Sequence, residues 1–260
     1  MNKEEQIYYI KTNFPLYKTN GSKRMIRHDF FKNINTELQA YLLGFYVADG
    51  SIDEKRKTFR IHLSKKDKEL VDLYKEIISP EARTFIVKQH FTTGRKKSKI
   101  IAHESYGVDI NSSILVNDLN NLNYGYRKSY LNLSLPMIDE KLIRHFIRGY
   151  FDGDGCITGW MSYEKCKSDR FRYSFDISGK TKSLLNDIIC YFEKYDIKIN
   201  INYIVRDDMF RIKTSSKNDI KKIYNILYND SNFYLSRKFN KFNYYVNTEV
   251  NQLIADHPNA

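Results

Sequence analysis

Two stretches of the chain are rich in hydrophobic residues, carry small residues four positions apart, and end in Asp-Gly. They span residues 41–50 and 146–155. Residues four apart lie on one face of a helix, and small side chains on such a face let two helix backbones approach closely. The pattern therefore predicts two helices that pack on these faces, with their carboxyl ends converging. The small residues are Gly44, Ala48, Gly149 and Gly153.

The pattern that follows each of these helices is also repeated. Residues 59–64 and 170–178 alternate between hydrophobic and polar positions, which is typical of strands with one buried face. Each half is expected to read α-β-β-α-β-β-α, with Thr36 and Asp139 capping the two motif helices and Pro136 marking the linker. The prediction is an α+β fold of two pseudo-symmetric repeats with antiparallel sheets and a central two-helix interface. Its segments are an extension over 1–34, a first repeat over 35–136 and a second repeat over 137–260.

Charge narrows the partners of such a protein. The 260 residues include 43 Lys and Arg against 31 Asp and Glu, a net charge of +12, which favours a polyanion such as nucleic acid. No hydrophobic run approaches the roughly 18 residues of a membrane span, and the polar start does not resemble a signal peptide. Three cysteines without CxxC spacing predict reduced thiols in an intracellular, cytosol-like compartment. This compartment could be a bacterial or phage-infected cell, or an organelle matrix.

The two Asp-Gly endings are the main candidates for chemistry. Asp49 and Asp154 would lie close together at the negative ends of two helix dipoles, where both effects oppose ionisation. Gly50 and Gly155 are expected to be left-handed caps just past each helix. A divalent cation between the carboxylates would offset their repulsion, and oxygen ligands with phosphate substrates indicate Mg²⁺. The alternative is that each Asp-Gly only ends a core helix.

These two motifs, with their repeated surroundings over roughly residues 35 to 245, resemble the LAGLIDADG homing endonucleases. The resemblance implies that the last acidic residue of each motif, Asp49 or Asp154, binds catalytic metal, with Gly50 and Gly155 beside it. It also implies a monomer that cuts both strands of a long asymmetric DNA target with Mg²⁺, for which Mn²⁺ would substitute. The first motif has Val47 where the family often has an acidic residue, and the second has Asp152 there. That position usually supports the helix interface, so Val47 is expected to leave cleavage intact.

Two lysines occupy equivalent places where a strand gives way to a helix. Lys66 lies three residues beyond Leu63, and Lys180 lies three residues beyond Ile177. In the family that these repeats resemble, a lysine at this junction often lies near the scissile phosphate, where its charge can stabilise the transition state. The alternative is an ordinary surface lysine at a helix start, and Lys65 is an adjacent competitor in the first half.

Basic residues on the outward faces of the predicted sheets are candidates for DNA contacts. Arg and Lys suit guanine edges and Asn suits adenine in the major groove, although solvated strand faces look the same in sequence. The candidates are Arg60, His62, Arg170, Arg172, Asn202, Arg211 and Lys213. A second basic pair recurs after the last helix of each half and is interpreted as a phosphate clamp, with structural pairing as the alternative. These residues are Arg127, Lys128, Arg237 and Lys238.

The sequence leaves some alternatives open. The basic and aromatic segment before residue 35 could be an arm along the DNA backbone or a strap packed on the first repeat. The whole chain is predicted to be a site-specific, metal-dependent endonuclease for double-stranded DNA. The alternatives are a maturase that binds intron RNA and a catalytically silent DNA-binding regulator on the same fold.

Overall fold

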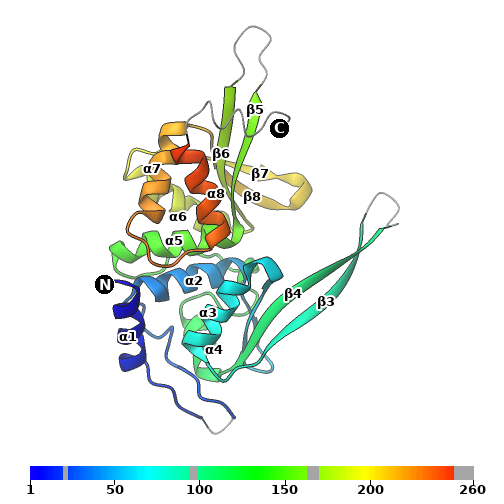
Figure 1. Cartoon of the computed structure of the whole chain (residues 1–260), viewed down its shortest axis with the longest axis vertical. Coiled ribbons are helices and arrows are strands. Elements are labelled where there is room, and N and C mark those ends of the chain that lie inside the picture. Colours follow the sequence, from blue (N-terminus) through cyan, green and yellow to red (C-terminus); the bar gives the residue numbers. More distant parts are fainter. Residues whose placement is uncertain (20–22, 94–98, 163–169, 249–260) are drawn as a thin grey trace.

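The computed structural model describes residues 1–19, 23–93, 99–162 and 170–248. Two lobes meet along a pair of helices, α2 (Glu37–Asp49) and α5 (Glu140–Asp154), which lie side by side at the boundary between them (Figure 1). The first lobe continues with β1 (Ser51–Asp53), β2 (Thr58–Ser64), α3 (Lys68–Ile78), β3 (Thr84–Thr93), β4 (Lys99–Asn111) and α4 (Ser113–Asn121). The second continues with β5 (Gly155–Ser162), β6 (Arg170–Gly179), α6 (Lys182–Glu193), β7 (Asn200–Ile204), β8 (Met209–Thr214), α7 (Lys217–Tyr228) and α8 (Ser236–Asn247). Each lobe therefore contains the predicted α-β-β-α-β-β-α order, and α8 follows it.

The two sheets have the same topology. Their strand orders are β1-β2-β4-β3 and β5-β6-β8-β7, and all neighbouring strands are antiparallel. Alternate side chains of β2 and β6 are buried under the helices, which cover one face of each sheet (Figure 1). Because the side-chain period of a strand is two, the polar residues between them lie on the other face. The predicted α+β fold with two antiparallel sheets is confirmed.

The helix pair is packed through the predicted small residues. A Cβ added at Gly44 would lie 1.9 Å from the carbonyl oxygen of Phe146, and one added at Gly149 would lie 2.0 Å from that of Tyr41. The two backbones are therefore in direct contact. Nearer the carboxyl ends, a Cβ at Gly153 would lie 2.4 Å from the Cβ of Ala48. Together these glycines bring the ends of α2 and α5 together.

Buried polar side chains fix the register of this helix pair. The guanidinium of Arg148, fully buried in α5, donates to the Glu37 carboxylate of α2 at 2.7 Å. Asp152 accepts from the hydroxyl of Tyr41 at 2.8 Å and from that of Tyr228 at 2.7 Å. Burial raises the pKa of Asp152, and these hydrogen bonds oppose the rise. Val47, at the matching place in α2, is buried without a polar role, so Asp152 alone links the helices at this level.

The segment before the first repeat is a strap. Its first helix, α1 (Lys3–Asn13), begins with a capping box and buries Gln6 and Ile10. Further along, the backbone amide of Arg27 donates to the carbonyl of Ile78 at 2.8 Å, and the buried His28 ring lies 2.6 Å from the hydroxyl oxygen of Ser112. Of the two alternatives from sequence, packing on the first repeat is the one observed for the described residues.

Candidate active site

The two motif carboxylates lie together at the carboxyl ends of α2 and α5. A Cβ added at Gly153 would come within 2.9 Å of the Asp49 Oδ2 atom, so this carboxylate lies against the residue preceding Asp154. Both aspartates are exposed at the surface, yet protein atoms crowd around them on their other sides. Burial is the largest cause that raises the pKa of each group. The charge of Asp49 adds to this effect at Asp154 and raises its pKa to about 7.

The prediction of left-handed caps at Gly50 and Gly155 is wrong. Their φ angles are −74° and −88°, and both residues are extended. The reason for glycine is space. A Cβ at Gly50 would lie 2.1 Å from the ring of Tyr46, and one at Gly155 would lie 2.1 Å from the ring of Phe151. The backbone thus turns into the next strand directly under an aromatic ring of the preceding helical turn.

Two lysines complete the symmetry of the site, with Lys238 buried and Lys128 half-buried. Lys128 donates to the carbonyl oxygen of Gly50, and Lys238 donates to that of Gly155. Each ammonium also lies over the aromatic ring beside that glycine, 5.1 Å from the centroid of Tyr46 for Lys128 and 5.3 Å from that of Phe151 for Lys238. The structure therefore places these two lysines against the ends of the motif helices; the sequence interpretation was a phosphate clamp, with structural pairing as the alternative.

The charges at this centre act on one another across the two repeats. Burial lowers the pKa of Lys128 to about 8, and the carboxylates of Asp154 and Asp49 oppose the change. Burial also lowers the pKa of Lys238. In turn, the charges of both lysines oppose the rise in the pKa of Asp49 and of Asp154. Two carboxylates and two ammonium groups therefore form one electrostatic unit.

The donor set fits a divalent cation that shares its coordination with substrate. Two carboxylates are forced together by the glycine contacts, and no arginine forms an ion pair with either of them among the described residues. The described residues contain no cluster of three or more His, Cys, Asp or Glu side chains that could enclose an ion. Mg²⁺ commonly binds through one or two carboxylates together with waters and substrate phosphates. The backbone carbonyls of Gly50 and Gly155, the other predicted metal ligands, already accept from lysines.

The two junction lysines lie in different surroundings. Lys180 lines a pocket of about 240 Å³ together with Asp154 and Lys128, and its ammonium lies 6.0 Å from the ring centroid of Tyr130. Lys66 lies in a short 3₁₀ turn, Lys65–Asp67, and its side chain is exposed. Lys180 therefore shares a pocket with a motif carboxylate.

The candidate DNA contacts of the two sheets differ in their surroundings. In the first sheet, Arg60 is paired with Asp53 at 2.8 Å, and His62 lies 2.7 Å from a carboxylate oxygen of Asp109. These two candidates for DNA contact therefore have acidic partners. In the second sheet, Lys213 and Asn202 are exposed, and Lys213 lies 5.8 Å from the ring centroid of Trp160.

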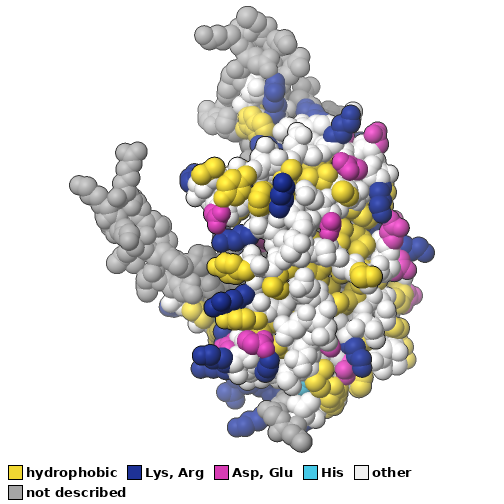
Figure 2. Space-filling model, turned by 180° about the vertical axis from the view of Figure 1, so that it is seen from behind, with side chains coloured by type: hydrophobic (Ala, Val, Ile, Leu, Met, Phe, Trp, Pro, Cys, Tyr) yellow, Lys and Arg dark blue, Asp and Glu magenta, His cyan; other side chains and the backbone are white. Residues whose placement is uncertain are grey.

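The other candidates of the second sheet have mixed surroundings. Arg211 donates to the hydroxyl of Ser178 at 3.0 Å and lies 3.9 Å from the Asp176 carboxylate. Arg172 is exposed, and the side chain of Arg170 lies outside the described residues. On the face shown in Figure 2, Lys and Arg side chains lie along the left edge of the molecule, with some acidic side chains among them.

The two predicted clamp arginines are also unlike each other. Arg237 forms a two-point ion pair with Asp67 of the first repeat, with the Nη2 atom 2.8 Å from Oδ2. Arg127 is exposed, adopts a left-handed φ of 55°, and lies 5.2 Å from the ring centroid of Tyr126. No local pattern marks Asp67 as functional, because its partner lies 170 residues away.

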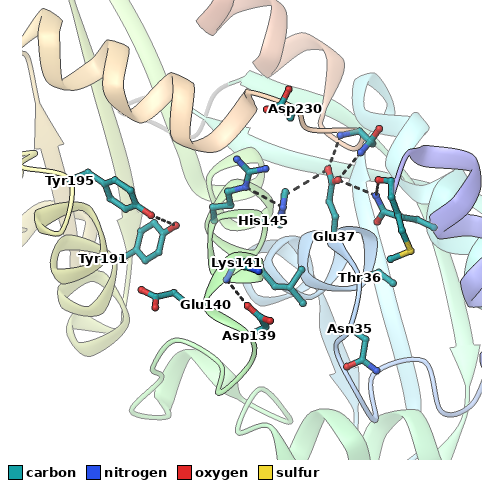
Figure 3. A pocket seen from close by; sticks show the side chains of 15 residues that line it. Asn35, Thr36, Glu37, Asp139, Glu140, Lys141, His145, Tyr191, Tyr195 and Asp230 are labelled. Carbon is teal, nitrogen blue, oxygen red and sulfur yellow. Dashed lines mark hydrogen bonds and ion pairs between the residues drawn. The ribbon is translucent and has the colours of Figure 1, made fainter.

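A larger pocket, of about 720 Å³, lies at the opposite ends of the motif helices (Figure 3). Its wall contains the Glu37 carboxylate, which accepts hydrogen bonds from Arg148, Gln6 and the backbone amide of Asn232. Burial lowers the pKa of His145 in the same wall and keeps this ring neutral. These groups satisfy one another, so this part of the pocket wall belongs to the buried network that joins the repeats.

No helix within the described residues is long and apolar enough to cross a membrane. Residues 36–117 match the family model described as a LAGLIDADG-like domain. A segment of 178 residues is 24% identical to the DNA-directed RNA polymerase subunit Rpo1C of Methanocaldococcus jannaschii. This match covers 68% of the chain but only 17% of that much longer protein.

Three solved structures share the fold over most of both chains. The meganuclease I-SmaMI bound to uncleavable DNA gives a TM-score of 0.53 at 14% identity and covers 86% of this chain and 93% of that one. The homing endonuclease I-GzeII in complex with its DNA target gives 0.53 at 15%, covering 84% and 90%. The meganuclease I-CpaMI bound to uncleaved DNA gives 0.52 at 15%, covering 86% and 92%.

Proposed function

This chain carries a LAGLIDADG-like domain and has the two-repeat LAGLIDADG fold, and from that premise we propose that it is a site-specific endonuclease for double-stranded DNA. The observation that carries the proposal is the pair of carboxylates, Asp49 and Asp154, held together at the ends of two helices in backbone contact. Holding like charges together costs stability, and the arrangement is useful where a cation and a phosphate group complete the site. The net charge of +12 supports a polyanionic substrate.

In this proposal the residues of the site have different roles. Asp49 and Asp154 would hold Mg²⁺, or Mn²⁺ in its place, and the bound ion would supply Lewis-acid stabilisation of the phosphodiester. Lys128 and Lys238 place positive charge where negative charge develops on the scissile phosphate. With a pKa of about 8, Lys128 is still mostly protonated at neutral pH. Lys180, which lines the pocket beside Asp154, and its counterpart Lys66 are retained as catalytic candidates.

Binding is assigned to the outer faces of the sheets and the edge between them. Lys213, Asn202 and Arg172 are the exposed candidates in the second sheet. Arg60 and His62 in the first sheet have acidic partners, so DNA binding through them requires the exchange of those ion pairs for phosphate or base contacts. The chain acts as a monomer because each repeat supplies one carboxylate.

The test is selection of cleaved sites from a random or genomic DNA library with Mg²⁺, followed by single-turnover cleavage of the selected duplex. Asp49→Asn and Asp154→Asn should each nearly abolish double-strand cleavage while DNA affinity holds or rises, because a negative charge is removed. Normal cleavage of both strands by both variants would contradict the assignment. Specific binding without any cleavage by the parent protein would indicate a DNA-binding regulator, and preference for intron RNA would indicate a maturase.

The lysine assignments are tested on the same duplex. Lys180→Met should lower the single-turnover rate far more than it lowers affinity, because a lost transition-state contact costs on the order of 10²-fold in rate. Lys66→Met should be milder, since Lys65 lies beside it as a substitute. Equal and small rate losses with a clear drop in affinity would make both lysines phosphate contacts instead.

A further inference from the structure

Four successive residues at the start of α8 each form a hydrogen bond or an ion pair with another part of the protein. The Leu235 amide donates to Asp152 at 2.7 Å, and the Ser236 amide donates to Glu69 at 2.8 Å. Arg237 is paired with Asp67, and Lys238 donates to the carbonyl of Gly155. Two of these four contacts, those of Ser236 and Arg237, cross from the second repeat to the first.

The ion pair between Asp67 and Arg237 is well built for positioning. Asp67 is 7% exposed and its two oxygens accept from two nitrogens of the same guanidinium. Such a two-point pair fixes orientation as well as distance. Arg237 is the residue before Lys238, so the pair holds the backbone from which the lysine reaches the carboxyl end of α5.

Lys128 of the first repeat has no equivalent ion pair beside it among the described residues. Thr181 occupies the place equivalent to Asp67, one residue beyond the junction lysine, and it donates to the carbonyl of Leu131 instead. Arg127, the equivalent of Arg237, forms no ion pair within the described part of the chain. The segment of Lys128 therefore contacts the other repeat through a hydrogen bond of 3.4 Å between neutral groups, whereas the segment of Lys238 is held by a two-point ion pair.

Resting on the function proposed above, we propose that Asp67 is a positioning residue for Lys238 and makes the two strand cleavages unequal. The strand whose phosphate faces Lys238 is cut first, because its lysine is fixed before DNA binds. Small displacements at a reacting group carry large rate penalties. Asp67 and Arg237 carry opposite charges, and they shift the pKa of Asp49 in opposite directions. Variants of the two residues can therefore distinguish a positioning role from an electrostatic effect on Asp49.

The experiment uses the full chain and its selected duplex, with a different fluorophore on each strand, and measures both single-turnover rates. Lys238→Met first identifies the strand that depends on this lysine. Asp67→Asn should slow that strand on the order of 10-fold more than the other, and Arg237→Gln should do the same. Adding Asp67→Asn to Lys238→Met should produce little further loss, because both changes act through one lysine.

The controls separate the possible outcomes. Electrostatic action on Asp49 would make Asp67→Asn and Arg237→Gln change the rate in opposite directions, which would overturn the proposal. Glu140→Gln, which breaks the ion pair with Lys194 at the far end of α5, should leave the strand ratio unchanged. If Asp67→Asn fails to fold, Glu69→Gln loosens the same helix start at an exposed position and should shift the ratio in the same direction. If the parent protein cuts both strands and the ratio of the two strand rates is the same in all these variants, this inference alone is overturned. If the parent protein cuts no DNA, the proposed function is overturned as well.

Discussion

The contact between the motif helices leads to a sharp prediction for the smallest possible change, Gly44→Ala. The added Cβ would lie 1.9 Å from the Phe146 carbonyl oxygen, about 1.5 Å short of an ordinary contact of 3.4 Å. Neither partner can rotate away, because both belong to helix backbones. The helices must therefore separate on the order of 1 Å and lose dispersion contacts along the whole interface.

The magnitude follows from this geometry. Overpacking in a core costs about 1–3 kcal/mol, and a clash between two backbones belongs at the upper end. About 3 kcal/mol corresponds to a fall in Tm of roughly 6–12 °C for a chain of this size. Because α2 and α5 carry the carboxylates, the same displacement should slow cleavage on the order of 10²-fold in the molecules that remain folded.

The assay is a thermal melt combined with single-turnover cleavage well below the lowered Tm. Gly149→Ala, whose Cβ would lie 2.0 Å from the Tyr41 carbonyl oxygen, should behave like Gly44→Ala. Lys221→Ala, at an exposed position of α7, is the control for a surface helix change and should alter stability by no more than about 0.5 kcal/mol. A Tm for both glycine variants that matches the parent would show that these helices are not in backbone contact.

Three further predictions concern charge. Glu37→Ala should lower the free energy of unfolding by about 3–5 kcal/mol, because it leaves the buried Arg148 guanidinium without its carboxylate. The double variant with Arg148→Met should lose less than the sum of the two single losses, and additive losses in denaturant melts would contradict the pairing. The raised pKa of Asp154, about 7 in the folded protein, means that the folded state binds more protons than the unfolded state between about pH 4 and 7, so stability falls as pH rises through this window. In the absence of metal, Asp154→Asn should therefore have a Tm equal to that of the parent near pH 4 and progressively higher toward pH 7, and a constant difference across the window would refute this. DNA affinity should fall with salt at a log–log slope of about −0.9 per neutralised phosphate, and a slope near zero would argue against a basic DNA-binding surface.

The features that sequence predicted are those set by local patterns. Small residues four apart, hydrophobic residues two apart and a motif that recurs once indicated the helix pair, the two sheets and the pairing of Asp49 with Asp154. The helix and strand patterns depend on neighbours within one helical turn or one strand. The repeat then placed the two carboxylates together, because two like units that pack on the same face bring equivalent ends together.

Only the tertiary structure showed the conformation of the motif glycines and the contacts between residues far apart in the chain. The conformation of Gly50 and Gly155 depends on the rings of Tyr46 and Phe151 above them, so space and not backbone handedness requires glycine there. The Arg-Lys pairs were visible as a repeat, but their partners lie 78 to 170 residues away in the chain. Only the packing of the two repeats could show that Lys128 and Lys238 reach the ends of the motif helices, and that Asp67 holds Arg237 while Arg127 has no such partner among the described residues. A contact between distant segments depends on how their shapes and charges meet in space, and the sequence around each segment does not record its partner.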